Sequence, residues 1–116
     1  MQNTFQPPKT ISEIAAVFLS LTPMRDTMLK SRLQFWLDRY GDKPLSELSP
    51  DDADAGLAQL EIMTGRNGKP LSGPTINRYR SAMQSLIKFA RQKRLLPRGW
   101  LSPFKDIQQH EENPGK

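Results

Sequence analysis

The residues best suited to chemistry are cations and amides that recur between Pro74 and Arg94. At 100° per residue, one arc of a helix over this stretch is apolar and holds Ile76, Tyr79, Met83, Leu86, Ile87 and Ala90. The opposite side and its flanks hold Asn77, Arg78, Arg80, Ser81, Gln84, Ser85, Lys88, Arg91 and Gln92. Arg and Lys neutralise phosphates, and Asn, Gln and Arg match the donors and acceptors of base edges in the major groove. The stretch therefore predicts a helix that packs on one side and binds nucleic acid on the other.

The charges of the chain are unevenly distributed. No Asp or Glu occurs between Glu61 and Asp106, although this interval contains ten Lys and Arg residues, and the net charge of the whole chain is +5. A solvated helix face usually mixes signs, because opposite charges four residues apart stabilise it. The pattern favours a polyanionic partner. Composition alone leaves open the alternative of an ordinary soluble helix in a basic protein.

Several classes of site are excluded by composition. The chain has no cysteine and a single histidine, His110, so thiolate chemistry and paired imidazoles are excluded. Nucleotide-binding glycine motifs are missing, and the acids around Asp51 are explained by the dipole at a helix start. We therefore expect no metal, no cofactor and no catalysis by this chain alone.

The chain also lacks targeting and membrane signals. The longest apolar run, residues 15–21, is far shorter than the roughly 20 residues that a membrane span requires. The first residues lack the pattern of a signal peptide. We therefore expect a cytoplasmic protein that does not contact a membrane.

Four helices are predicted, each with its own start signal. The expected starts are a capping box at 10–13, Thr22-Pro23, Ser49-Pro50, and Ser72 or Gly73 followed by Pro74. The first helix is expected to end near Ser20 and the second at Gly41. Between the last two helices, residues 64–73 form a turn-rich loop.

The apolar residues predict how these helices pack. Phe35 points away from the apolar arc of the second helix, and we interpret it as a contact with a neighbouring helix. Leu45 and Leu48 are expected in the core, and the segment after Arg94 is expected to fold back and close the bundle. The fold class is a small all-α bundle. Residues 1–9 are predicted to be a flexible arm, 10–107 one domain, and 108–116 a linker or tail.

The order of these pieces resembles the N-terminal core-binding domain of phage-type integrases, the tyrosine site-specific recombinases. The resemblance covers roughly residues 10–107 and is carried by TISEIAAVFL, MLKSRLQFWLDRYGDKPLSELSPDD, and SGPTINRYRSAMQSLIKFARQKRLL with the SPF segment that follows. One departure is Ser102-Pro103, which stands where the family has Asn-Pro.

The resemblance implies a four-helix orthogonal bundle of the SAM-like kind, with a short closing C-terminal segment. Such a domain is one half of a clamp around a DNA core site, acts in DNA integration and recombination, and belongs to a bacterial or phage-encoded protein. Its implied partners are duplex DNA at the attachment core site, the C-terminal catalytic domain of the parent protein, and neighbouring protomers on DNA. The catalytic motifs of the family are not matched here, and Tyr40 and Tyr79 lie on apolar arcs.

The family places the second and fourth helices in or beside the major groove. The implied DNA contacts are Arg25, Thr27, Met28 and Ser31 on the second helix, and Pro74, Thr75, Asn77, Arg78, Ser81 and Gln84 on the fourth. The charge pattern adds Lys69, Arg80, Lys88 and Arg91. Two alternatives are a helical protein-interaction module with a basic face and a helix-turn-helix repressor. The second is disfavoured, because the 64–73 connection exceeds the usual turn of about 3–4 residues.

Overall fold

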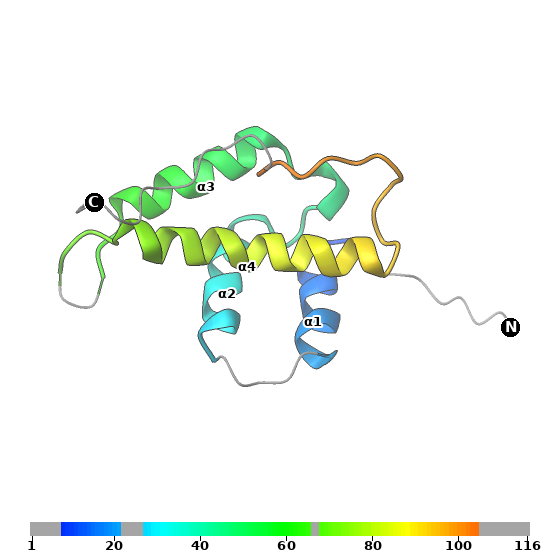
Figure 1. The fold of residues 1–116 in the computed structure, drawn as a ribbon, viewed down its shortest axis with the longest axis horizontal. Helices are drawn as coiled ribbons and strands as arrows, with labels where there is room; N and C mark the ends of the chain where they lie inside the picture. Colours follow the sequence, from blue (N-terminus) through cyan, green and yellow to red (C-terminus); the bar gives the residue numbers. More distant parts are fainter. Residues whose placement is uncertain (1–7, 22–26, 66–67, 105–116) are drawn as a thin grey trace, which may run out of the picture.

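Helix α4 is the element on which the other helices pack. The computed structural model describes residues 8–21, 27–65 and 68–104. In this part of the chain the elements are α1 (Ile11–Leu21), α2 (Thr27–Tyr40), the short 3-10 helix η1 (Leu45–Glu47), α3 (Pro50–Ile62) and α4 (Gly73–Gln92). Helices α1 and α2 extend from one side of α4, and α3 lies on its other side (Figure 1). The predicted all-α fold with four helices is confirmed.

The predicted capping box at the start of α1 is present. The backbone N–H of Glu13 donates to Thr10 Oγ1 at 3.1 Å, and the backbone N–H of Thr10 donates to Glu13 Oε1 at 3.0 Å. These reciprocal bonds satisfy backbone groups that a helix start leaves without partners. The predicted start of α2 at Thr22-Pro23 lies outside the described residues.

Helices α3 and α4 also begin at the predicted caps. Ser49 Oγ accepts from the N–H of Asp52 at 3.1 Å, Asp52 Oδ2 accepts from the N–H of Ser49 at 3.1 Å, and Pro50 follows the cap. At the start of α4, Ser72 Oγ accepts from the N–H of Thr75 at 3.3 Å. Local sequence therefore determines three of the four helix starts.

Trp36 lies at the centre of the core and is fully buried. Its Nε1–H donates to the carbonyl oxygen of Tyr79 at 3.0 Å, which joins α2 to α4. Its ring meets Phe35 and Phe104 edge-on, at centroid distances of 5.1 and 5.5 Å. The Phe35 ring also lies 5.6 Å from that of Tyr79, so the interpretation of Phe35 as an interhelical contact is confirmed.

The segment after α4 closes the bundle, as predicted. Trp100 Nε1–H donates to the carbonyl oxygen of Ser46 at 2.8 Å, and Phe104 is fully buried. Leu45 and Leu48 are buried as expected. The core contains Ile11, Ile14, Ala15, Leu33, Trp36, Leu45, Leu48, Ala53, Leu57, Leu60, Ile76, Ala82, Met83, Leu86, Ile87, Phe89, Ala90 and Phe104.

Two residues expected on the cationic side of α4 are buried instead. Asn77 and Arg80 are each only 4% exposed, so their predicted place on the exposed side is wrong. The buried arc of α4 is wider than its apolar residues indicate, because α1, α2 and α3 all pack on this helix. Arg80 Nη2 donates to the carbonyl oxygen of Phe104 at 3.0 Å, and burial lowers the pKa of Arg80. Arg80 therefore holds the closing segment against α4.

Helix α4 ends in a Schellman motif. The N–H of Leu95 donates to the carbonyl oxygen of Ala90 at 2.8 Å, and the N–H of Arg94 donates to the carbonyl oxygen of Arg91 at 3.0 Å. The residue between helix and exit in this motif is normally glycine, because its backbone is left-handed. Here it is Arg94, with φ of 58°.

The packing of Trp36 makes Gly56 a sensitive position. A Cβ at Gly56 would overlap Cζ3 of Trp36 and lie 2.7 Å from its Cη2. We expect Gly56→Ala to destabilise the fold by about 1–3 kcal/mol, although alanine normally favours a helix by about 1 kcal/mol. Chemical denaturation measures this, with Ala55→Gly on the exposed side of α3 as the control for propensity. A stabilised Gly56→Ala protein would contradict the close packing.

The cap of α3 predicts a pH dependence. Burial by itself raises the pKa of Asp52, but hydrogen bonds from Lys43, at 2.7 Å, and from Ser49 outweigh it, so the pKa lies below its ordinary value. Because a lowered pKa favours the folded state only while the carboxylate is ionised, this stability is present above about pH 4 and is lost in more acidic solution. We expect Asp52→Asn to lower stability by about 1 kcal/mol at pH 7 and by less below pH 4.

Thermal unfolding of both proteins between pH 7 and pH 2 measures the difference. Asp54→Asn is the control, because Asp54 is an exposed carboxylate on the same helix. A difference between the parent protein and Asp52→Asn that stayed constant over this range would contradict the assignment.

The end of α4 predicts a stabilising substitution. Arg94→Gly is expected to raise the free energy of unfolding by about 1 kcal/mol, because glycine adopts left-handed backbone without the Cβ clash. Lys93→Gly is the matched control: it also removes one cation, but Lys93 has φ of −93°. Denaturant titration distinguishes the two, and equal effects on stability would contradict the expectation.

Candidate nucleic-acid interface

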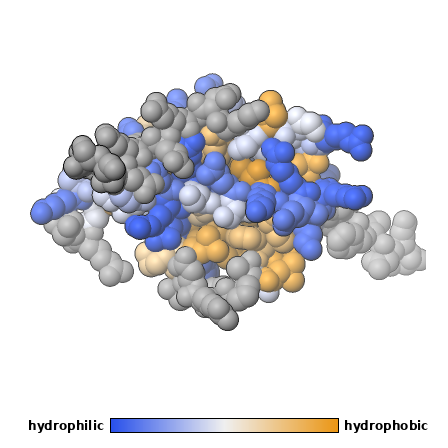
Figure 2. All heavy atoms as spheres, in the orientation of Figure 1, coloured by the Kyte–Doolittle hydropathy of each residue, from blue (hydrophilic) through white to orange (hydrophobic). Residues whose placement is uncertain are grey.

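Helix α4 presents one exposed polar face, here called the α4 face. Its residues are Arg78, Ser81, Ser85, Lys88 and Arg91, all exposed. Figure 2 shows hydrophilic side chains in a band along α4, with apolar atoms below it, where α1 and α2 lie. The prediction that Arg78, Ser81, Lys88 and Arg91 lie away from the core is confirmed.

The cations of the α4 face are not neutralised by the fold. Within residues 8–21, 27–65 and 68–104, no carboxylate forms an ion pair with Arg78, Lys88 or Arg91. The ion pair between Lys43 and Asp52, at 2.7 Å, lies at the start of α3. The α4 face therefore offers uncompensated positive charge to solvent.

Gln84 and Thr75 lie at the margins of this surface. Gln84 is half-buried and lines a shallow pocket of about 220 Å³ with Ile87, Lys88, Arg91 and Ser102. Thr75 is half-buried in the first turn of α4, and its hydroxyl lies 2.9 Å from that of Ser72. The cap thus already engages the Thr75 hydroxyl, whereas Gln84 adjoins the cations.

The loop before α4 is closed, and it carries Lys69. An isolated bridge pairs Thr64 with Pro70, and the N–H of Gly65 donates to the carbonyl oxygen of Lys69 at 2.7 Å. Lys69 is exposed, three residues before the cap at Ser72. The chain therefore keeps Lys69 close to the start of α4.

The predicted contacts on α2 are not gathered beside the α4 face. Arg25 and the side chain of Thr27 lie outside the described residues. Ser31 is exposed, and so is Met28. Both belong to the first half of α2, which begins at the end farther from α4 (Figure 1). Of the predicted contacts, the structure thus brings Arg78, Ser81, Lys88 and Arg91 together, with Gln84 at their edge.

Two exposed cations near this surface were missed. Arg94 and Arg98 line a pocket of about 480 Å³ together with Arg91. Their charges are visible in the sequence, but the turn that brings Arg98 back beside Arg91 is not, because no local pattern determines where the segment after α4 packs.

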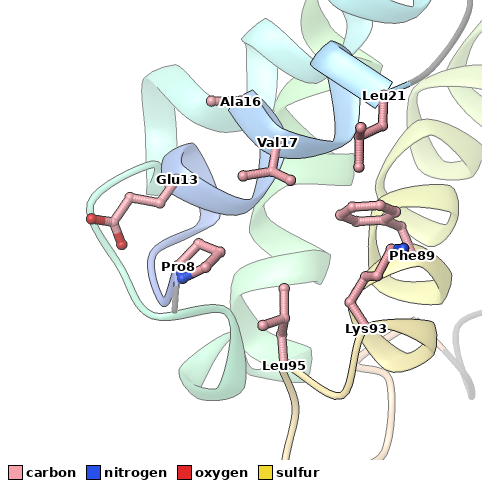
Figure 3. A pocket seen from close by; sticks show the side chains of 8 residues that line it. All are labelled: Pro8, Glu13, Ala16, Val17, Leu21, Phe89, Lys93 and Leu95. Atoms are coloured by element: carbon pink, nitrogen blue, oxygen red, sulfur yellow. The ribbon is translucent and has the colours of Figure 1, made fainter. Parts of the chain in front are cut away.

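A second pocket differs from the one beside Arg91, because most of its lining residues are apolar. A pocket of about 680 Å³ is lined by Pro8, Glu13, Ala16, Val17, Leu21, Phe89, Lys93 and Leu95 (Figure 3). Its centre is apolar, and the carboxylate of Glu13 points away from it. Hydrogen bonds from the backbone N–H groups of Lys9 and Thr10 lower the pKa of Glu13, so this carboxylate serves the helix cap.

The part of the chain that the structure describes lacks two other kinds of site. No group of three or more His, Asp or Glu side chains there could hold a metal ion, and no helix there has the length and apolarity to cross a membrane. Comparison of the chain with models of protein families, with curated proteins and with solved structures finds no match.

Proposed function

We propose that this protein is a DNA-binding domain, the core-binding half-clamp of a phage-type integrase, and that it binds duplex DNA through the α4 face. It does no chemistry itself; strand cleavage belongs to a catalytic domain elsewhere in the parent protein. Exposure of Arg78, Ser81 and Lys88, with no carboxylate paired to either cation among the described residues, carries this proposal.

The dimensions of the α4 face suit duplex DNA. Arg78 and Arg91 are thirteen positions apart on one helix, which corresponds to about 20 Å at 1.5 Å per residue. The major groove is about 12 Å wide, so cations at both ends of the helix can reach phosphates on either side of it. Between them, Ser81, Ser85 and Gln84 supply hydroxyl and amide groups, which bind phosphates or base edges.

The sequence resemblance supports the family assignment. The stretch SGPTINRYRSAMQSLIKFARQKRLL corresponds to α4 and its exit, and the proline-broken SPF segment packs back on the bundle. The finer SAM-like fold is part of the same proposal. Asn77 and Arg80 are removed from the set of DNA contacts, because both are buried. Base readout is accordingly assigned to Arg78 and Gln84, and phosphate contact to Lys88 and Arg91.

Association with the rest of the parent protein sets the expected affinity. A half-clamp that binds alone lacks the second half, whose tethering raises the effective concentration at the site. The isolated domain is therefore expected to bind weakly, and neighbouring protomers on the core site would add further contacts. The exposed Lys69, in the loop that leads into α4, is a further proposed contact with the DNA backbone.

Salt-dependent binding tests the proposal. Fluorescence anisotropy with a labelled duplex, repeated at several salt concentrations, gives the affinity and its slope against salt. We expect Lys88→Ala to weaken every duplex alike and to reduce the slope by about 1, because one phosphate contact is lost. Arg78→Ala is expected to cost about 1–3 kcal/mol on a duplex in which it reads a guanine, and less on others.

Arg39→Ala is the matched control, because Arg39 is an exposed cation of α2 and is not one of the residues of the α4 face. Its affinity and slope should equal those of the parent protein. Affinity that is independent of salt, or equal losses for Lys88→Ala and Arg39→Ala, would contradict DNA binding by the α4 face. The alternative of an acidic protein partner would then be favoured, and duplex DNA would fail to compete for that partner.

A further inference from the structure

The pocket beyond the end of α4 gathers three guanidinium groups. It holds about 480 Å³ and is lined by Arg91, Arg94, Leu96, Pro97, Arg98, Gly99 and Trp100. Arg91 belongs to the last turn of α4, Arg94 to the Schellman motif that ends it, and Arg98 to the turn that follows. None of the lining residues is acidic, and within the described part of the chain no carboxylate pairs with any of the three.

The Arg91 guanidinium is held in place before any ligand arrives. Its Nη2 donates to the carbonyl oxygen of Trp100 at 3.0 Å, and its Cζ lies 5.8 Å from the centroid of the Trp100 ring. Trp100 is itself fixed by its 2.8 Å bond to Ser46. One of the five guanidinium N–H donors is used in this way, and the others remain for a ligand. A fixed, planar donor set of this kind suits the oxygens of a phosphate.

The backbone at Arg94 is a second indication of a binding role. This residue occupies the left-handed position of the Schellman motif, with φ of 58°, where glycine is the most stable choice. Among the described residues it is the only one other than glycine with positive φ. The dipole at the helix end favours a cation, but Lys93 and Arg91 already supply that charge. Compared with glycine, an arginine at this position lowers the stability of the backbone but adds a guanidinium group to the pocket.

We propose that this pocket is a phosphate-binding site, in which Arg91, Arg94 and Arg98 bind the oxygens of one phosphate group. Repulsion between three like charges in one pocket is relieved when a phosphate binds, and the ligand forms charge-assisted hydrogen bonds with the guanidinium groups. The site adjoins the α4 face and shares Arg91 with it, but its other two arginines lie beyond the helix, and phosphate binding here does not require that the proposed function be correct. The phosphate comes from a nucleic-acid backbone or from a free phosphorylated compound.

Titration with inorganic phosphate tests the site directly. Amide and indole N–H resonances of residues 94–100 are followed as phosphate is added, with sodium chloride adjusted to keep the ionic strength constant. We expect saturable shifts at Gly99, Trp100 and the Trp100 indole. Arg94→Gly and Arg98→Ala should each weaken phosphate binding about tenfold, since each removes one charge-assisted contact. Arg94→Gly should do so while melting at a higher temperature than the parent protein, so the loss cannot come from unfolding.

Two further measurements identify the source of the phosphate and separate this site from the α4 face. If the source is a nucleic-acid backbone, Arg94→Gly and Arg98→Ala also weaken duplex binding and reduce its salt slope; if it is a free compound, duplex binding is unchanged. Arg78→Ala, which alters only the α4 face, should leave the phosphate titration unchanged. Absence of saturable shifts at constant ionic strength, or retention of full phosphate affinity by Arg94→Gly and Arg98→Ala, would overturn the proposal whatever the duplex measurements give.

Discussion

The burial of Trp36 is the constraint on which the rest of the structure depends. Its indole fills the space between α2, α3 and α4, and Gly56 is the residue on α3 that leaves room for it. Its N–H reaches the backbone of α4 at Tyr79, and its ring meets Phe104 of the closing segment. The Trp36 side chain thus determines how closely α3 approaches α2 and where the segment after α4 packs.

Helix α4 is the centre of the packing and also carries the proposed binding surface, and these two roles impose opposite demands on one helix. Three helices and the closing segment pack against it, which removes most of its circumference from solvent. What remains exposed is a narrow face that carries Arg78, Lys88 and Arg91 on a backbone held by the packed side of the helix. If this face binds DNA as proposed, the packed backbone needs no further ordering, and the entropy cost of binding falls mainly on the exposed side chains. The buried Arg80 adds to the packing of α4, since it joins this helix to the carbonyl oxygen of Phe104 in the closing segment.

Two features near α4 lower stability, and the proposed binding role would account for both. Like charges along α4 repel one another, and opposite-charge pairs that would stabilise the helix are missing from its exposed face. At the end of the same helix, an arginine occupies a left-handed position that suits glycine. The missing ion pairs and the left-handed arginine both belong to α4 or its end, whereas the caps of α1, α3 and α4 follow the ordinary rules of helix starts.

The sequence by itself determined what depends on near neighbours in the chain: the helices, three helix starts, the apolar arcs and the cationic character of α4. These features are local because a cap or a helical stripe involves residues only three or four positions apart. Tertiary structure alone decided that Asn77 and Arg80 are buried and that Arg98 returns beside Arg91. Both outcomes depend on where distant segments pack, and helical periodicity cannot indicate how many neighbours cover a helix or which polar side chain a distant carbonyl group will reach.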